Sequence, residues 1–163
     1  MNTTFARLLT LSTLALALGS AFAADSAPPA PTPAAAAADK LGAARAQIAA
    51  KNWSGAIDEL KKVNDTGSAD WNNLMGYSLR KAKTPDLAGS EKFYNDALRI
   101  DPKHKGALEY SGELYLMLNQ LPKAEGRLAT LDKACFLPCG EYTELKNAIA
   151  AYKANGNQYV ARQ

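Results

Sequence analysis

A spacing of 34 residues repeats along the chain, and it constrains the fold more than any other feature of the sequence. Each repeat places a small residue first, a large residue four positions later and an apolar residue three positions after that. These spacings put the three residues on one face of an α-helix. The three sets are Ala56, Leu60 and Val63; Ser90, Tyr94 and Ala97; and Ala124, Leu128 and Leu131. The repeat predicts three equivalent helices, each the second helix of a helix pair.

The first helices of the pairs align less regularly. Gly76 and Gly112 occupy equivalent places but lie 36 residues apart, so two extra residues must sit in the second unit. We expect them in the turn at residues 81–86, because surface turns absorb insertions at little cost. In this turn Thr84 is expected to cap the following helix, with Pro85 at the first helical position.

A seventh helix is expected at residues 141–154, before Gly156 as a stop signal. Its apolar residues recur at spacings of three and four, and its opposite face is polar. A helix of this kind can cover the apolar side that the last pair of a stack would otherwise expose. The apolar residues are Tyr142, Leu145, Ile149 and Tyr152.

Two stretches of the chain resemble tetratricopeptide repeats, NNLMGYSLRKAKTPDLAGSEKFYNDALRIDP and ALEYSGELYLMLNQLPKAEGRLATLD. They carry the family's pattern of a large apolar residue, glycine, an aromatic residue or leucine, and then alanine, an aromatic residue or leucine, alanine or leucine, and Asp-Pro. The matching residues are Gly76, Leu79, Tyr94, Ala97 and Pro102 in the second unit, and Leu108, Gly112, Tyr115, Ala124 and Leu128 in the third. The first unit is degenerate, since Ala44 stands at the glycine position.

The resemblance covers residues 40–154 and implies an all-α fold. Specifically, it implies a right-handed α-solenoid of about three helix pairs followed by a C-terminal capping helix. The units would span about 40–66, 69–102 and 105–134, with the capping helix at 141–154 and a flexible tail at 155–163.

The resemblance also implies a binding surface. In similar proteins the first helices of the pairs form a concave wall that binds peptide segments or helices of partners. Carried over to this sequence, the wall positions are Arg45, Asp70, Asn73, Tyr77, Arg80, Glu109 and Glu113. Tyr77 offers a rigid contact surface and Arg80 a forked donor. We therefore expect a non-enzymatic scaffold or adaptor. Because Glu109 and Glu113 would repel an acidic group, the expected ligand is a mixed-charge peptide or helix.

Residues 1–23 are typical of a cleavable export signal. Arg7 is followed by an apolar stretch at 8–22, and the small residues Ala21 and Ala23 predict cleavage after Ala23. This stretch is short for a membrane-spanning helix, which needs about 20 apolar residues. An uncleaved membrane anchor is the alternative. The alanine-rich style favours the bacterial periplasm, where the partner would be an envelope protein.

Residues 24–39 form a separate segment of the sequence, rich in proline and alanine. Proline fixes φ and removes a hydrogen-bond donor, so this segment is expected to be an extended linker. Its prolines are Pro28, Pro29, Pro31 and Pro33, and five alanines follow them.

The composition disfavours several classes of function. The net charge of +3 is too small and too scattered to indicate a nucleic-acid partner. One histidine and two cysteines leave too few ligands for a zinc site built from several such residues. His104 is expected to be a solvated turn residue. We therefore expect no cofactor and no catalysis, while self-association through the ends of the stack stays open.

The two cysteines lie four positions apart, in Cys135-Phe-Leu-Pro-Cys139. In an oxidising compartment this spacing favours a disulfide, which would stabilise the fold by about 2 kcal/mol. The alternative is a thiol-redox or metal-handling accessory protein that uses Cys135 and Cys139, because a thiolate is favoured near a helix N-terminus.

Overall fold

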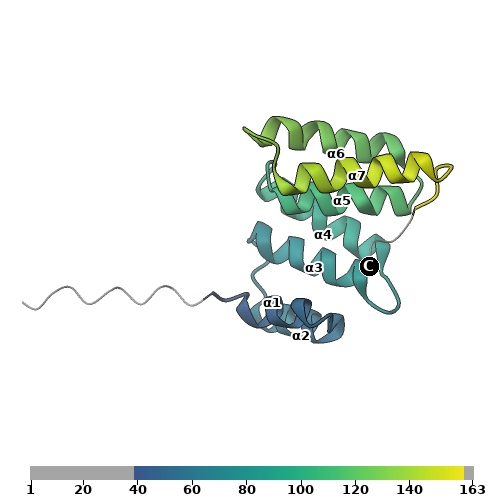
Figure 1. Cartoon of the computed structure of the whole chain (residues 1–163). Helices are drawn as coiled ribbons and strands as arrows, with labels where there is room; N and C mark the ends of the chain where they lie inside the picture. The colour runs from purple at the N-terminus through teal and green to yellow at the C-terminus, as the bar shows by residue number, and fades with distance from the viewer. Residues whose placement is uncertain (1–38, 160–163) are drawn as a thin grey trace, which may run out of the picture. The chain divides into compact units, whose positions relative to one another are not determined.

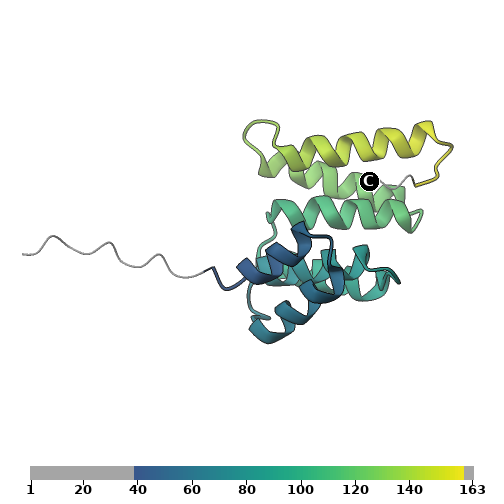
Figure 2. The same ribbon diagram turned by 60° about the horizontal axis from the view of Figure 1, so that its bottom comes forward.

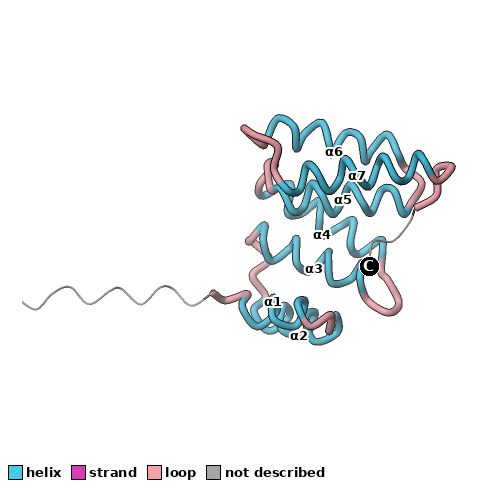
Figure 3. The backbone as a smooth tube through the Cα atoms, viewed as in Figure 1, coloured by secondary structure: helices cyan, strands magenta, loops and turns pink. Residues whose placement is uncertain are grey.

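The computed structural model describes residues 39–159, and every regular element among them is an α-helix. Figure 3 shows the helices joined by loops. The helices are α1 (Gly42–Ala49), α2 (Trp53–Val63), α3 (Ala69–Lys81), α4 (Leu87–Ile100), α5 (Lys105–Met117), α6 (Leu121–Ala134) and α7 (Gly140–Ala154). The predicted all-α class is confirmed. The predicted export signal, the linker up to residue 38 and residues 160–163 of the tail lie outside the described residues.

The helices pack in pairs that follow the order of the chain. In Figure 1, α1 lies on α2, α3 on α4 and α5 on α6, and the same pairs make the helix contacts within residues 39–159. Successive pairs meet through α2 with α3 and through α4 with α5. The first helices also touch in order, α1 with α3 and α3 with α5. Figure 2 shows α7 running beside the last pair, where it contacts both α5 and α6.

The 34-residue repeat accounts for the buried faces of the second helices. Most of its nine positions are fully buried, with Leu128 and Val63 partly exposed. The fully buried residues are Ala56, Leu60, Ser90, Tyr94, Ala97, Ala124 and Leu131. One apolar cluster joins α1, α2 and α3, and a second joins α5, α6 and α7. Each cluster is therefore built from consecutive helices, which is the packing expected of a repeat.

The turn between α3 and α4 contains the predicted insertion. It has five residues, 82–86, whereas the equivalent turn between α5 and α6 has three, 118–120. The expected cap at Thr84 is wrong: the N-cap of α4 is Asp86, whose carboxylate accepts a hydrogen bond from the Gly89 N–H at 2.8 Å. An aspartate is at least as good a cap as a threonine, so the helix begins later and Pro85 stays in the turn.

Helix α7 begins at Gly140 and buries one apolar face on the last pair. The buried residues are Leu145, Ala148, Ile149 and Tyr152. Beyond the helix, Gly156 takes a positive φ of 65°, a conformation that favours glycine and turns the chain. Tyr159, in the part predicted as a flexible tail, is partly buried against the α5–α7 cluster. Over residues 39–159, no helix combines the length and apolar character that a membrane span requires.

Helices α3 and α4 approach each other most closely at Gly76. A Cβ atom there would lie 2.9 Å from the Tyr94 ring and 3.1 Å from the Ser90 carbonyl oxygen. Because Tyr94 is fully buried, its ring has little room to move.

We therefore expect Gly76→Ala to lower the free energy of unfolding by about 1–3 kcal/mol, although alanine favours helix formation. The matched control is Gly126→Ala in α6, where a Cβ meets nothing within 4 Å. That variant should gain about 0.5–1 kcal/mol from helix propensity alone. Urea unfolding of both variants measures the difference, and equal stabilities would contradict the close approach of α3 and α4.

Candidate functional site

The seven predicted wall residues lie on the first helices of the three pairs. Arg45 is on α1; Asp70, Asn73, Tyr77 and Arg80 are on α3; Glu109 and Glu113 are on α5. Because α1 contacts α3 and α3 contacts α5, these residues belong to adjoining helices. We call this surface of α1, α3 and α5 the first-helix face.

At the N-terminal end of α3, side chains join the three first helices. Asp70 accepts a hydrogen bond from the Arg45 guanidinium at 3.4 Å. The other carboxylate oxygen of Asp70 lies 2.9 Å from Nε2 of His104. Both Arg45 and Asp70 are about half exposed, so this ion pair contributes little stability. It does place the three side chains next to one another.

His104 is not the solvated turn residue that the sequence suggested. Its side chain is only 14% exposed, and it is the N-cap residue of α5. Its Nδ1 atom accepts a hydrogen bond from the Ala107 N–H at 3.0 Å. Nδ1 must then be unprotonated, which leaves the hydrogen of a neutral ring on Nε2, from which it is donated to Asp70.

At the C-terminal end of α3, Arg80 forms a buried ion pair with Glu113 of α5. The guanidinium donates to the carboxylate at 2.8 Å, and the two side chains are 2% and 11% exposed. We expected Arg80 to present its donors to a partner, but the structure directs this group toward Glu113. Asn73 is buried too, at 6% exposure. Arg80 and Asn73 therefore support the first-helix face from beneath.

Aromatic rings lie between these two ends. The ring centroids of Tyr77 and Tyr110 are 4.5 Å apart, and the Trp53 ring meets Tyr77 edge-on at 5.7 Å. The Arg80 guanidinium carbon is 5.6 Å from the Tyr77 centroid and 5.7 Å from that of Tyr110. This is the distance range of a cation–π interaction with each ring.

A cavity of about 350 Å³ opens beside these rings. We call it the acid-aromatic pocket; its lining is Tyr77, Arg80, Lys81, Glu109, Tyr110, Glu113 and Glu144. Three carboxylates face two cations, so the lining carries a formal charge of −1. A smaller cavity of about 170 Å³ adjoins it, sharing Arg80 and Lys81 and reaching Tyr159.

The tyrosines of the pocket are held in the neutral form. Burial, and after it the negative charge of Glu109, raises the pKa of Tyr110 to about 12. Burial likewise raises the pKa of Tyr77. Near neutral pH the pocket therefore offers uncharged ring faces beside carboxylates.

Three residues of the pocket are not among the predicted wall positions, namely Lys81, Tyr110 and Glu144. Tyr110 stands next to the predicted Glu109 and one helical turn before Glu113, so the helical spacing could have found it. Glu144 belongs to α7 and lies on the helix face that the sequence predicts to be polar. Its place in the pocket depends on how α7 lies against α5, and no local pattern in the sequence specifies that.

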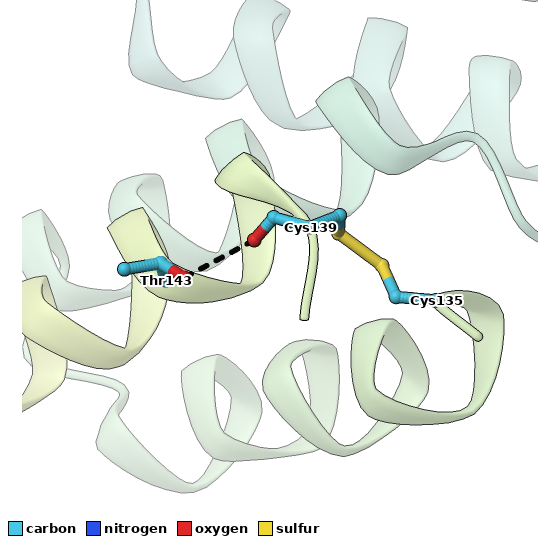
Figure 4. The surroundings of a disulfide bond; sticks show 3 residues. All are labelled: Cys135, Cys139 and Thr143. Carbon is cyan, nitrogen blue, oxygen red and sulfur yellow. Dashed lines mark hydrogen bonds between the residues drawn. A yellow bond between two sulfur atoms is a disulfide. The ribbon is translucent and has the colours of Figure 1, made fainter. Parts of the chain in front are cut away.

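The predicted disulfide between Cys135 and Cys139 is present, with the two Cα atoms 5.8 Å apart (Figure 4). Cys135 is the C-cap residue of α6 and Cys139 is the N-cap residue of α7. The Thr143 hydroxyl donates to the Cys139 carbonyl at 3.2 Å within the first turn of α7. Phe136 and Leu137, at the tip of the loop, are exposed to solvent. A disulfide is compatible with an oxidising compartment.

Comparison of the chain with protein-family models, with curated proteins and with solved structures finds no match.

The Arg80–Glu113 pair yields a test of how the site is supported. In Glu113→Gln the Arg80 guanidinium stays buried beside a neutral amide, so we expect a loss of about 3 kcal/mol in the free energy of unfolding. The matched control is Glu125→Gln, which removes the partner of Lys153 from a pair that is about half exposed. That change should cost less than about 1 kcal/mol. Urea denaturation compares the two, and a small loss in both variants would contradict the buried pair.

Proposed function

We propose that this chain is an exported, tetratricopeptide-repeat-like adaptor without catalytic activity. Its three helix pairs would stack as a right-handed α-solenoid, and α7 would cover the last pair. A peptide or helix of a partner protein would dock on the first-helix face. The bacterial periplasm is the proposed compartment, and an envelope protein the proposed class of partner.

The observation that supports this proposal most strongly is the arrangement of the first helices. The contacts Arg45–Asp70, Asp70–His104 and Arg80–Glu113 link them in chain order. Between these links lie the half-buried ring of Tyr77 and the acid-aromatic pocket. Rigid aromatic residues beside buried charge pairs are typical of the centres of protein interfaces.

Site-specific crosslinking tests the proposed docking face. A photo-crosslinking aromatic amino acid is placed at position 77 and the protein is expressed with its own N-terminal segment in its native host. We expect one discrete partner to be captured and identified by mass spectrometry. The matched control places the same amino acid at position 92, whose side chain is 71% exposed on the second helix α4.

Capture from both positions alike, or of the chain itself alone, would contradict docking on the first-helix face. A partner captured at 77 must also bind the purified protein before it counts in favour.

The alternative function, a thiol-redox or metal-handling accessory protein, predicts different behaviour of Cys135 and Cys139. For the adaptor, we expect alkylation without reductant to leave the intact mass unchanged, because the disulfide holds both sulfur atoms. Changing both cysteines to serine should lower stability by about 2 kcal/mol and leave crosslinking at position 77 intact. Free thiols in the isolated protein, or loss of function with the fold preserved, would favour the alternative.

A further inference from the structure

We propose that a separate cavity, lined by Tyr115, Lys123, Gly126 and Arg127, binds a phosphate group. The cavity measures about 240 Å³ and lies where α6 packs on α5. We call it the Tyr115 cavity. Its lining residues differ from those of the acid-aromatic pocket. This inference therefore goes beyond the proposed docking function and does not depend on it.

Arg127 supplies a cation in a fixed position. Its Nη2 atom donates to Oδ1 of Asn95 on α4 at 3.0 Å and to the Tyr115 hydroxyl at 3.4 Å. Its guanidinium carbon lies 5.6 Å from the centroid of the Tyr115 ring. The partners of Arg127 are thus an amide, a hydroxyl and a ring, and within residues 39–159 no carboxylate pairs with it.

The environment of Arg127 leaves its charge to be balanced by a ligand. The residue is half-buried, and its Nε atom is buried without a hydrogen-bond partner in the part of the chain that the structure describes. A charge that is partly withdrawn from water and has no counter-charge is unfavourable. An anion entering the cavity would offset this cost through a charge-assisted hydrogen bond.

Lys123 supplies a second cation beside the same ring. Its ammonium nitrogen lies 4.9 Å from the centroid of Tyr115. It also lies 3.7 Å from a carboxylate oxygen of Glu91 on α4, and its side chain is 55% exposed. An ion pair this long and this exposed contributes little, so the flexible ammonium can turn toward a ligand at small cost.

The charges around the Tyr115 cavity favour an anion. Arg127 and Lys123 are opposed by the single carboxylate of Glu91, which leaves a net positive charge. The carboxylate of Glu125, which lies between the two cations in the sequence, pairs instead with Lys153 of α7 at 2.6 Å. Two cations beside one ring repel each other, and an anion between them relieves that repulsion.

The remaining donors favour phosphate over a carboxylate. A carboxylate binds arginine best through two parallel N–H bonds, and both forked edges of a guanidinium include Nη2. In Arg127 this atom already donates to Asn95 and Tyr115. A phosphate group carries about two negative charges and has three acceptor oxygens in a tetrahedral arrangement. It can therefore accept from Nη1 of Arg127 and from the Lys123 ammonium as two separate donors.

NMR titration of the purified protein with inorganic phosphate, at constant pH and ionic strength, tests the proposal. We expect saturable shifts of the backbone amide signals around Tyr115, Lys123, Gly126 and Arg127. The dissociation constant should be on the order of 1 mM, since a few charge-assisted contacts supply the affinity. Shifts that do not saturate, or that spread over lysines throughout the chain, overturn the proposal.

Variants identify the groups that bind. Arg127→Gln should weaken phosphate binding about tenfold, and Lys123→Gln about threefold. Because the Lys123 side chain is exposed, its variant remains informative even if Arg127→Gln lowers stability. The matched control is Lys62→Gln, which removes a 70% exposed ammonium beside Glu59 on α2 and should have no effect. Unchanged binding in both cavity variants overturns the site.

Two further arms define the ligand. Acetate titrated in place of phosphate tests the class of anion, and equal affinities overturn the assignment to phosphate. A small phosphorylated molecule and a phospholipid headgroup present the same chemistry, so sedimentation with phosphatidylglycerol vesicles separates these two sources. Sedimentation that Arg127→Gln and Lys123→Gln abolish assigns a headgroup. Phosphate binding without sedimentation assigns a small molecule. Docking on the first-helix face is tested independently, by crosslinking at position 77.

Discussion

The buried ion pair between Arg80 and Glu113 is the interaction on which the candidate site depends. Removing two charges from water costs several kcal/mol, and the pair recovers this only while both partners stay in place. The pair therefore fixes the C-terminal half of α3 against α5, and its guanidinium also contacts the rings of Tyr77 and Tyr110. At the other end of α3, Asp70 contacts His104 of the next pair. These two polar contacts, one at each end of α3, fix the register of α3 against α5. Apolar packing alone is less directional and would allow the two helices to slide along each other.

Much of this arrangement follows from periodicity. The small residues Ala56, Ser90 and Ala124 recur at the same place in each repeat, and all three are fully buried. The two extra residues in the turn between α3 and α4 could be located because the apolar periodicity of the helices on both sides is clear. The sequence could not reveal which of two competing residues caps a helix, or how closely neighbouring helices approach each other. Asp86 displaced Thr84 as a cap because both can accept the same kind of hydrogen bond, and only the register of α4 decides between them.

The sequence correctly predicted which helices carry the candidate site. It did not predict which of the site's side chains are exposed and which are buried. Tyr77 lines the pocket and is half-buried. Arg80, Glu109 and Glu113 line it too but are buried, and Asn73 is buried as well. A helical wheel assigns a direction to each side chain, but burial also depends on how closely the neighbouring helix approaches. The side chain of His104 is similarly enclosed by the helix that it caps and by Asp70 of the previous pair.

Helix α7 combines two roles that a simple capping helix would not have. It buries the apolar side of the last pair, and it also brings Glu144 to the acid-aromatic pocket. The disulfide closes the loop directly before this helix, so it restricts where α7 can begin relative to α6. Glu144 lies little more than one helical turn beyond Cys139, within the part of α7 that this restriction controls most directly. The covalent link therefore acts on the negative edge of the pocket as well as on stability.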